Sequence, residues 1–148
     1  ASDVYKRQFI AEVGADMGRF PTAGHLVSWV GFCPRLDESA GKARSTKIRK
    51  GNAWLKTTLV QCAWAAIRSS GYFRTRYHRV RSRAGKMKAI IAVARTMVAA
   101  AYHMLTNGEV YRDLGEGFLD KRDRERVARS LTRRLSRLGY EVELRPAA

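Results

Sequence analysis

The sequence has few cysteines and no apolar run long enough to cross a bilayer. The first absence argues against a structural zinc site, and the second against a membrane-spanning helix. Its 148 residues include only 2 cysteines, and neither Cys33 nor Cys62 lies in a CxxC pair or at the Cys/His spacing of a zinc site. A structural zinc site is therefore not expected, and two isolated thiols suit the reducing cytoplasm. The most apolar stretch, 89–102, is interrupted by Arg95 and is shorter than the roughly 20 residues of a membrane helix. No signal-peptide pattern is visible, and we expect no membrane partner.

Acidic residues are also scarce. The sequence holds 13 of them against 29 lysines and arginines, which gives a formal net charge of +16. Solubility does not need so much charge of one sign, so a polyanionic partner is indicated. Binding to an anionic membrane surface is the alternative, but the positive charge is spread along the whole chain rather than down one helix face. The composition therefore favours nucleic acid.

The most informative stretch is the one from Gly31 to Leu55. Pro34 fixes its own φ and disfavours helix at Cys33, so a preceding helix must end there. The Ser39–Lys42 stretch, Ser-Ala-Gly-Lys, then places a hydroxyl beside a glycine, where a backbone can approach a ligand closely. Long loops in compact domains are usually functional. We predict that this loop contacts a phosphodiester backbone through the following residues: Arg35, Lys42, Arg44, Lys47, Arg49, Lys50 and Asn52.

The fold class predicted from apolar periodicity is all-α, a small helical domain with a long basic loop (34–50) between helices. The expected helices are 22–31, 52–68, 72–83, 86–106 and 122–138. Trp29 is placed on the inner face of the first of these helices, and Trp54 begins the apolar face of the second. The last helix is amphipathic, and its apolar residues are expected to face inward: Val127, Leu131, Leu135 and Leu138.

Two segments allow two interpretations each. The helix ending near Val13, with the next one starting at Pro21, is either a remnant helix-hairpin-helix that grips nucleic-acid backbone or ordinary core packing. In 72–83, aromatic residues alternate with arginines. These aromatics either stack on bases or form a packed edge beneath a solvated basic face.

Four spaced motifs together resemble one known family, over roughly residues 10–114. They are Phe20-x-x-Ala23-x-x-Leu26-x-x-Trp29, Gly31-Phe32-x-Pro34-Arg35, Ser39-x-Gly41-Lys42-x-Arg44 and Ile48-x-Lys50-Gly51-Asn52-x-x-Leu55. Their order is similar to that in the C-terminal transposase domain of the IS116/IS110/IS902 insertion-sequence family, the bridge-RNA-guided DEDD/serine recombinases. Many members have glycine where this chain has Ala40.

The resemblance implies a role for Ser39 as the nucleophile of DNA strand exchange. A serine hydroxyl needs activation, and the neighbouring cations could stabilise charge at the phosphate. No general base is evident, although Asp37 and Glu38 are close in sequence. The family further implies Mg²⁺ held by an acidic RNase-H-like N-terminal domain, a guide RNA, dimers that pair into tetramers, and a bacterial, nucleoid-associated location in the cytoplasm.

The expected organisation has three parts. Residues 1–8 match one reading frame of a common sequencing adapter and are expected to be an assembly scar. Residues 9–121 form the transposase domain with the serine, and 122–148 form a basic helix and tail. On this view the chain is a C-terminal fragment that needs no cofactor of its own and is inactive without the acidic domain. The alternative function is a noncatalytic helical nucleic-acid-binding module.

Overall fold

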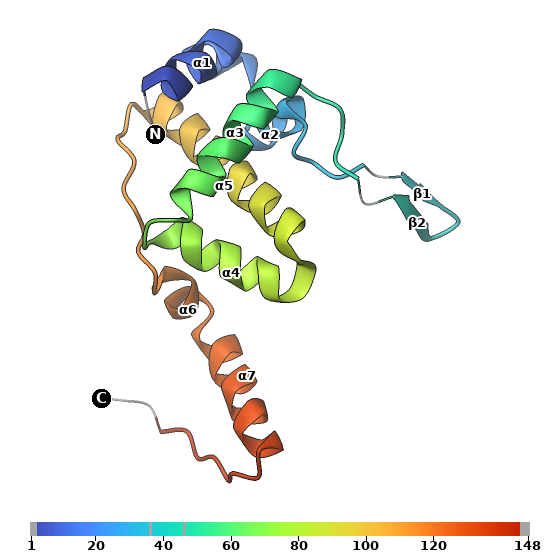
Figure 1. The fold of residues 1–148 in the computed structure, drawn as a ribbon, viewed down its shortest axis with the longest axis vertical. Helices are drawn as coiled ribbons and strands as arrows, with labels where there is room; N and C mark the ends of the chain where they lie inside the picture. Colours follow the sequence, from blue (N-terminus) through green and yellow to red (C-terminus); the bar gives the residue numbers. More distant parts are fainter. Residues whose placement is uncertain (1–2, 36, 46, 146–148) are drawn as a thin grey trace.

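The computed structural model describes residues 3–35, 37–45 and 47–145, and the side chains at 37–38 and 42–44 lie outside that description. The fold is all-α, as predicted, apart from one small antiparallel hairpin (Figure 1). Its elements, in chain order, are α1 (Asp3–Val13), the 3₁₀ turn η1 (Met17–Arg19), α2 (Ala23–Val30), β1 (Asp37–Ser39), β2 (Lys42–Ser45), α3 (Ala53–Ala66), α4 (Tyr72–Ala84), α5 (Lys86–Asn107), α6 (Phe118–Arg122) and α7 (Arg124–Arg137).

The long helices agree with the prediction, and the differences lie between them. The ranges 22–31, 52–68, 72–83 and 86–106 correspond to α2, α3, α4 and α5. The segment 34–50, predicted as a loop, instead contains the β1–β2 hairpin. The range 122–138 corresponds to α7, and the short helix α6, which ends at Arg122 just before it, was not predicted.

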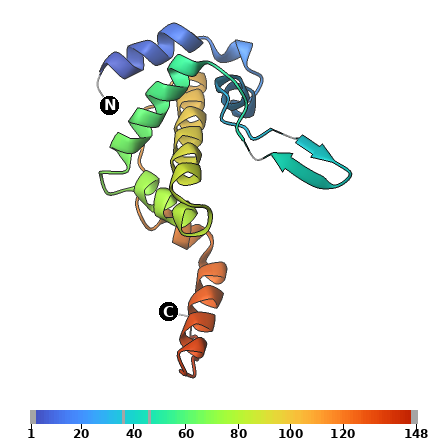
Figure 2. The same ribbon diagram turned by 45° about the vertical axis from the view of Figure 1, so that its right-hand side comes forward.

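Helix α5 is the centre of the domain. Helices α2, α3 and α4 pack around it, as the two ribbon views show (Figures 1 and 2). This helix has 22 residues and, by length and composition alone, could cross a membrane. The sequence did not suggest this, because its most apolar stretch, 89–102, is shorter than the helix. Within this fold, however, α5 is the core helix, because the following residues are buried against its neighbours: Ala89, Ile90, Val93, Ala94, Val98 and Tyr102.

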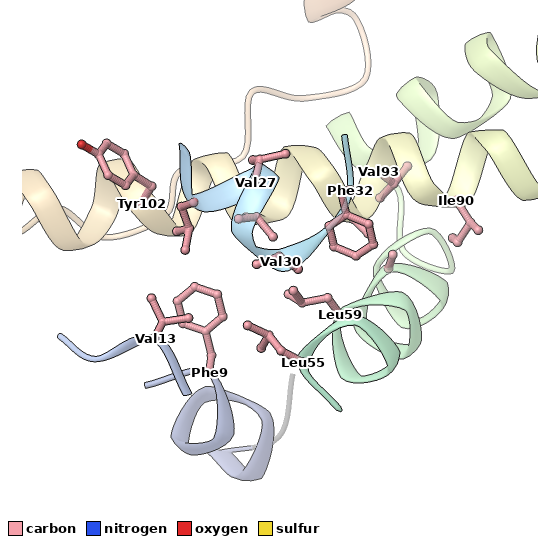
Figure 3. Packing of buried hydrophobic residues seen from close by; sticks show 14 of the residues in the cluster. Phe9, Val13, Val27, Val30, Phe32, Leu55, Leu59, Ile90, Val93 and Tyr102 are labelled. Atoms are coloured by element: carbon pink, nitrogen blue, oxygen red, sulfur yellow. The ribbon is translucent and has the colours of Figure 1, made fainter. Parts of the chain in front are cut away.

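One hydrophobic core joins α1, α2, α3 and α5 (Figure 3). Leu26, Leu55 and Ile90 are fully buried within it, and so is Phe32, which follows α2. Truncating a buried side chain of this size typically costs about 2–5 kcal/mol. The Tyr102 hydroxyl donates a buried hydrogen bond to the Phe20 carbonyl (2.9 Å), so the entrance to α2 is fixed to α5.

Local sequence determines where α2 and α3 end and begin. Gly31 adopts φ 94° after α2, and its N–H donates to Ser28 O (3.0 Å) while that of Phe32 donates to Val27 O (3.1 Å). This is a Schellman motif, which requires a residue that tolerates positive φ at that position. At the start of α3, Asn52 Oδ1 accepts the Leu55 N–H (3.0 Å) as an N-cap.

The prediction that the apolar residues of 122–138 face inward is wrong for three of the four, and the fourth, Val127, is only half-buried. Leu131, Leu135 and Leu138 are 55%, 40% and 69% exposed, and no residue of α7 is buried. The physical reason is that α7 leaves the domain after α6, so no core lies beneath it (Figure 2). Trp29 and Trp54, which were assigned to inner faces, are also exposed, at 41% and 76%.

The segment between α5 and α6 is fixed along α4 by Asp113. Its carboxylate accepts the Tyr72 N–H (3.1 Å) at the start of α4, the Gly115 N–H (2.6 Å) and the Tyr111 hydroxyl (3.1 Å). A Cβ on Gly71 would lie 3.0 Å from the carboxylate oxygens, so glycine makes room for this cap. Asp113 therefore acts as an N-cap for a helix that begins 41 residues earlier.

Candidate nucleic-acid interface

The predicted basic loop is a two-stranded ribbon that projects from the helices (Figure 1). Its lower part is held by two backbone hydrogen bonds, from Arg35 N–H to Lys47 O (2.9 Å) and from Arg49 N–H to Cys33 O (3.0 Å). Pro34 pairs with Ile48 between them. We call residues 32–50 the ribbon. Strand pairing therefore orders the described residues of the ribbon, at its base and again at its tip.

The ribbon leaves the domain through a narrow neck made by Gly31 and Gly51. A Cβ on Gly51 would lie 2.3 Å from Val30 O, and one on Gly31 would lie 2.9 Å from Arg49 O. The Lys56 ammonium donates to that same Arg49 carbonyl (2.9 Å). Burial lowers the pKa of Lys56. These contacts hold the two ends of the ribbon in van der Waals contact, so its direction is set by backbone packing.

At the tip, the Ser-Ala-Gly-Lys stretch forms a two-residue turn. Ala40 and Gly41 have φ of 52° and 74°, and Ser39 pairs with Lys42 across the turn. Positive φ at both central residues is the pattern of a type I′ turn, whose twist matches that of paired strands. Ala40 is the only non-glycine with positive φ among the described residues. The turn leaves Ser39 exposed at the far end of the ribbon.

A β-bulge lies just below the tip. Glu38 pairs with Ala43 but Asp37 pairs with Ser45, so Arg44 is the extra residue on β2. Bulges re-aim side chains and increase the twist of a strand. Below the bulge, Ser45 Oγ accepts the Lys47 N–H (3.2 Å), so this hydroxyl is used within the ribbon.

The structure brings most of the predicted site residues onto the ribbon, but in different roles. Arg35, Lys47, Arg49 and Lys50 are exposed along its lower part, and the backbone places Lys42 and Arg44 on β2 beside the tip. Asn52 is used within the protein, because its Oδ1 caps α3 and its Nδ2 donates to Glu12 Oε2 (2.5 Å). No group of three or more metal-ligating side chains occurs in the part of the chain that is described.

Two basic residues of α5 were missed by sequence reasoning. Lys88 and Arg95 line a groove of about 290 Å³ at the base of the ribbon, together with Phe32, Pro34 and Ile48. Both are exposed, and both lie on the side of the helix that does not face the core. Their charge was the only available signal, since nothing in the sequence indicates that the ribbon base packs against the start of α5.

The aromatic residues of α4 are packed rather than available for stacking on bases. Tyr77 is buried with its ring edge-on to Trp64, and Phe73 stacks on Tyr111 at a centroid distance of 5.6 Å. The interleaved Arg74, Arg81 and Arg83 are exposed. Of the two interpretations of 72–83, the structure therefore supports a basic face above a packed aromatic edge.

Comparison with known proteins identifies the family. The model of the transposase IS116/IS110/IS902 family matches residues 2–78, which include the whole ribbon. The uncharacterized 43.6 kDa protein of insertion element IS110 from Streptomyces coelicolor is 34% identical over 95 residues, covering 62% of this chain and 23% of that protein. The y4qE protein of Sinorhizobium fredii, which carries a transposase name, is 29% identical over 99 residues, covering 66% of this chain and 25% of that protein.

No solved structure matches the chain. The chain spans about a quarter of the length of the curated relatives that it matches. The family model covers more than half of the chain and contains all the motifs that form the neck, the arms and the tip of the ribbon. The chain therefore belongs to the IS116/IS110/IS902 family of transposases.

Proposed function

We propose that this chain presents a serine nucleophile for DNA strand cleavage and exchange in a longer transposase. The observation that carries the proposal is the position of Ser39, exposed at the tip of a basic ribbon and paired with Lys42 across the turn. A hydroxyl at the end of a projecting ribbon can reach a phosphate of a DNA duplex without moving the helical domain. Family membership supports the assignment.

The basic residues of the ribbon serve two purposes in this proposal. Arg35, Lys47, Arg49 and Lys50 lie exposed along its lower part, where they would contact phosphates and orient the DNA. Lys42 and Arg44 lie beside Ser39 on β2, where they would stabilise the charge that develops on the attacked phosphate. Asn52 would act indirectly, by fixing the neck through its cap and its bond to Glu12.

The chemical step forms a bond between Ser39 Oγ and phosphorus while the bond from phosphorus to one sugar oxygen breaks. The hydroxyl proton passes to a base, and the leaving sugar oxygen takes up a proton. The product is a phosphoserine link that keeps the energy of the phosphodiester. Attack by a second DNA end on that link releases Ser39 and completes the exchange.

The remaining components would come from outside this chain. The described residues include no group of three or more side chains that could hold Mg²⁺. We propose that acidic residues of an N-terminal domain hold it in the intact protein, and that a structured guide RNA selects the DNA. The intact protein would act as a dimer or tetramer in the bacterial cytoplasm, associated with the nucleoid.

A noncatalytic nucleic-acid-binding module is the second candidate. It is favoured by the exposed basic residues of the ribbon and of α4, which would bind phosphates whether or not Ser39 reacts. The two candidates differ in a single observable, because only the first forms a covalent protein–DNA bond.

The test is a pair of serine variants in the intact protein. Ser39→Ala should abolish strand cleavage and the covalent adduct while leaving DNA binding nearly unchanged, because the hydroxyl is exposed and fills no core volume. Ser45→Ala is the matched control on the same ribbon and should retain cleavage, since its hydroxyl accepts the Lys47 N–H below the bulge and does not lie at the tip. Cleavage that survives Ser39→Ala would exclude this nucleophile and leave the binding module.

A further inference from the structure

A second basic surface lies away from the ribbon, between α4 and the α6–α7 pair. It is a groove of about 830 Å³, and the following side chains of α4 and α7 supply most of its hydrogen-bond donors: Arg74, Thr75, His78, Arg79, Ser82, Arg83, Arg126 and Ser130. The α6–α7 segment extends from one end of the domain while the ribbon projects from its side (Figures 1 and 2).

The groove has a defined shape because one arginine ties its two walls together. Arg79 Nη2 lies 2.7 Å from Asp123 Oδ2, and its Nη1 donates to Leu119 O (3.0 Å). Both partners of this ion pair are largely covered by protein. The carboxylate is thereby fixed at the junction of α6 and α7, so the direction in which α7 leaves the domain is set relative to α4.

The charge of the lining is positive even when its acidic residues are counted. Four arginines line the groove against two carboxylates, Glu116 and Asp120. Because Arg79 is already paired with Asp123, the formal difference that remains for a ligand is three minus two, or +1. Beyond the groove, helical spacing places Arg133 and Arg137 in line with Arg126 along α7. A chain of phosphates laid along α7 would therefore meet cations from the groove to the end of the helix.

We infer that this groove binds the phosphate backbone of a nucleic acid independently of the ribbon. Arginine guanidinium groups and serine or threonine hydroxyls are the donors that commonly contact phosphate oxygens. The inference rests on one part of the proposed function, namely that the partner of this chain is a nucleic acid. It adds that the domain holds two separate segments of backbone, one at the ribbon and one between α4 and α7.

The first test compares arginines of the same helix, one that lines the groove and one that does not. Arg126→Gln is paired with Arg129→Gln on the same helix, and Arg83→Gln with Arg81→Gln, because Arg129 and Arg81 do not line the groove. Fluorescence anisotropy with a labelled DNA duplex and with a labelled RNA hairpin measures affinity over a salt series. Each groove variant should lose about tenfold in affinity and lower the salt slope by about 0.9, and each control should change neither.

A second test predicts a gain in affinity, which a variant that fails to fold could not produce. Asp120→Asn removes a negative charge from the groove and should tighten binding, while Glu125→Gln, outside the groove, should not. The thermal midpoint of each variant checks that the fold is retained. If Arg126→Gln lowers the affinity for only one of the two probes, the groove binds that nucleic acid. If it lowers the affinity for both, the groove binds the phosphate backbone that DNA and RNA share.

Lys47→Gln on the ribbon separates this inference from the proposed function. If the surfaces are independent, the free-energy losses of Lys47→Gln and Arg126→Gln should add in the double variant. Weakening by Lys47→Gln with none by Arg126→Gln would overturn the groove and keep the ribbon. Equal losses from Arg126→Gln and Arg129→Gln would also overturn it, because they indicate a diffuse positive surface. No loss from any of these variants would overturn both proposals.

Discussion

Gly31 and Gly51 touch each other through their backbones at the neck of the ribbon. A Cβ on Gly51 would lie 2.7 Å from the Gly31 nitrogen, and one on Gly31 would lie 3.0 Å from the Gly51 nitrogen. Real Cβ atoms essentially never lie within 3.0 Å of another atom, and a Cβ on Gly31 would also lie 2.9 Å from Arg49 O, so neither position accepts a side chain without movement. The ribbon that presents Ser39 is thus aimed by two residues 20 positions apart in the sequence.

Gly51→Ala should therefore separate the arms of the ribbon at their base. Forcing a methyl group against the Val30 carbonyl should cost about 1–3 kcal/mol in the free energy of unfolding. It should also weaken nucleic-acid binding, because the exposed ribbon residues lose their common direction. Urea unfolding and anisotropy measure the two effects. Gly117→Ala is the control, since the nearest atom to its added Cβ lies 4.0 Å away. A Gly51→Ala variant with native stability would contradict the tight neck.

Ala40→Gly should stabilise the tip of the ribbon. Ala40 has φ 52°, a conformation that costs a residue with a Cβ about 1 kcal/mol and costs glycine almost nothing. Hydrogen exchange of the β1 and β2 amides should slow by a few-fold, with cleavage by the intact protein retained. Ala53→Gly, at the first position of α3, is a control of opposite sign, because glycine weakens a helix. Faster exchange in Ala40→Gly would argue against the type I′ turn.

Asp113 should make part of the stability dependent on acid pH. Burial raises the pKa of its carboxyl, but hydrogen bonds from Gly115, Tyr72 and Tyr111 outweigh burial, and the net pKa is lowered. A carboxyl whose pKa is lower in the folded state stabilises fully above its unfolded pKa of about 3.9 and loses that contribution as pH falls through the folded value.

Asp113→Ala should accordingly cost about 1 kcal/mol near neutral pH, as loss of an N-cap does. The difference from the wild-type chain should shrink as the pH falls below about 4. Urea midpoints measured against pH check this, with Glu141→Gln as a control at an exposed carboxylate that forms no side-chain hydrogen bond or ion pair with the described residues. A difference that stays constant down to pH 2 would mean that the ionised carboxylate is not the cap.

The long helices could be predicted from the sequence because burial imposes a period on them. In α5 the buried residues recur every three or four positions, and Gly108 ends the helix in the left-handed conformation expected of a C-cap. In α7 the same kind of period correctly predicted a helix, but its apolar residues were wrongly expected to be buried. Periodicity shows that a helix has an apolar face, but not whether another element covers it.

The shape of the site could not be predicted, for two physical reasons. The Ala40-Gly41 turn lacks the asparagine or aspartate that usually signals a type I′ hairpin, and the arms are too basic to show an apolar alternation. The neck depends on contact between Gly31 and Gly51, which no local pattern reports. Ser39 and the basic residues were proposed as site residues from motifs, whereas the structural use of Asn52 became visible only through its contact with Glu12.

Loss of a basic residue beside the tip should harm the intact protein more than loss of one on the outer face of α7. Lys42→Gln and Arg44→Gln remove charge next to Ser39, where the attacked phosphate would lie. Each should lower the cleavage rate by tenfold or more, roughly the effect of removing one charge-stabilising donor. Arg129→Gln, an equal charge change on exposed α7, should have little effect. Equal losses in all three would make the ribbon an ordinary part of a basic surface.

The isolated 148-residue chain should bind nucleic acid but not cut it. Binding needs only the exposed cations, and it should weaken steeply with salt, by about 0.9 log unit per neutralised phosphate for each log unit of salt. Cleavage needs a group that activates the Ser39 hydroxyl, and we propose that this group lies on another domain. Anisotropy measures the binding, and a denaturing gel with Mg²⁺ and a labelled duplex measures the cutting. Salt-independent affinity would exclude phosphate contacts as the source of binding. Metal-dependent cleavage by the chain alone, lost in Ser39→Ala, would keep the nucleophile and show that its activating group lies within these residues.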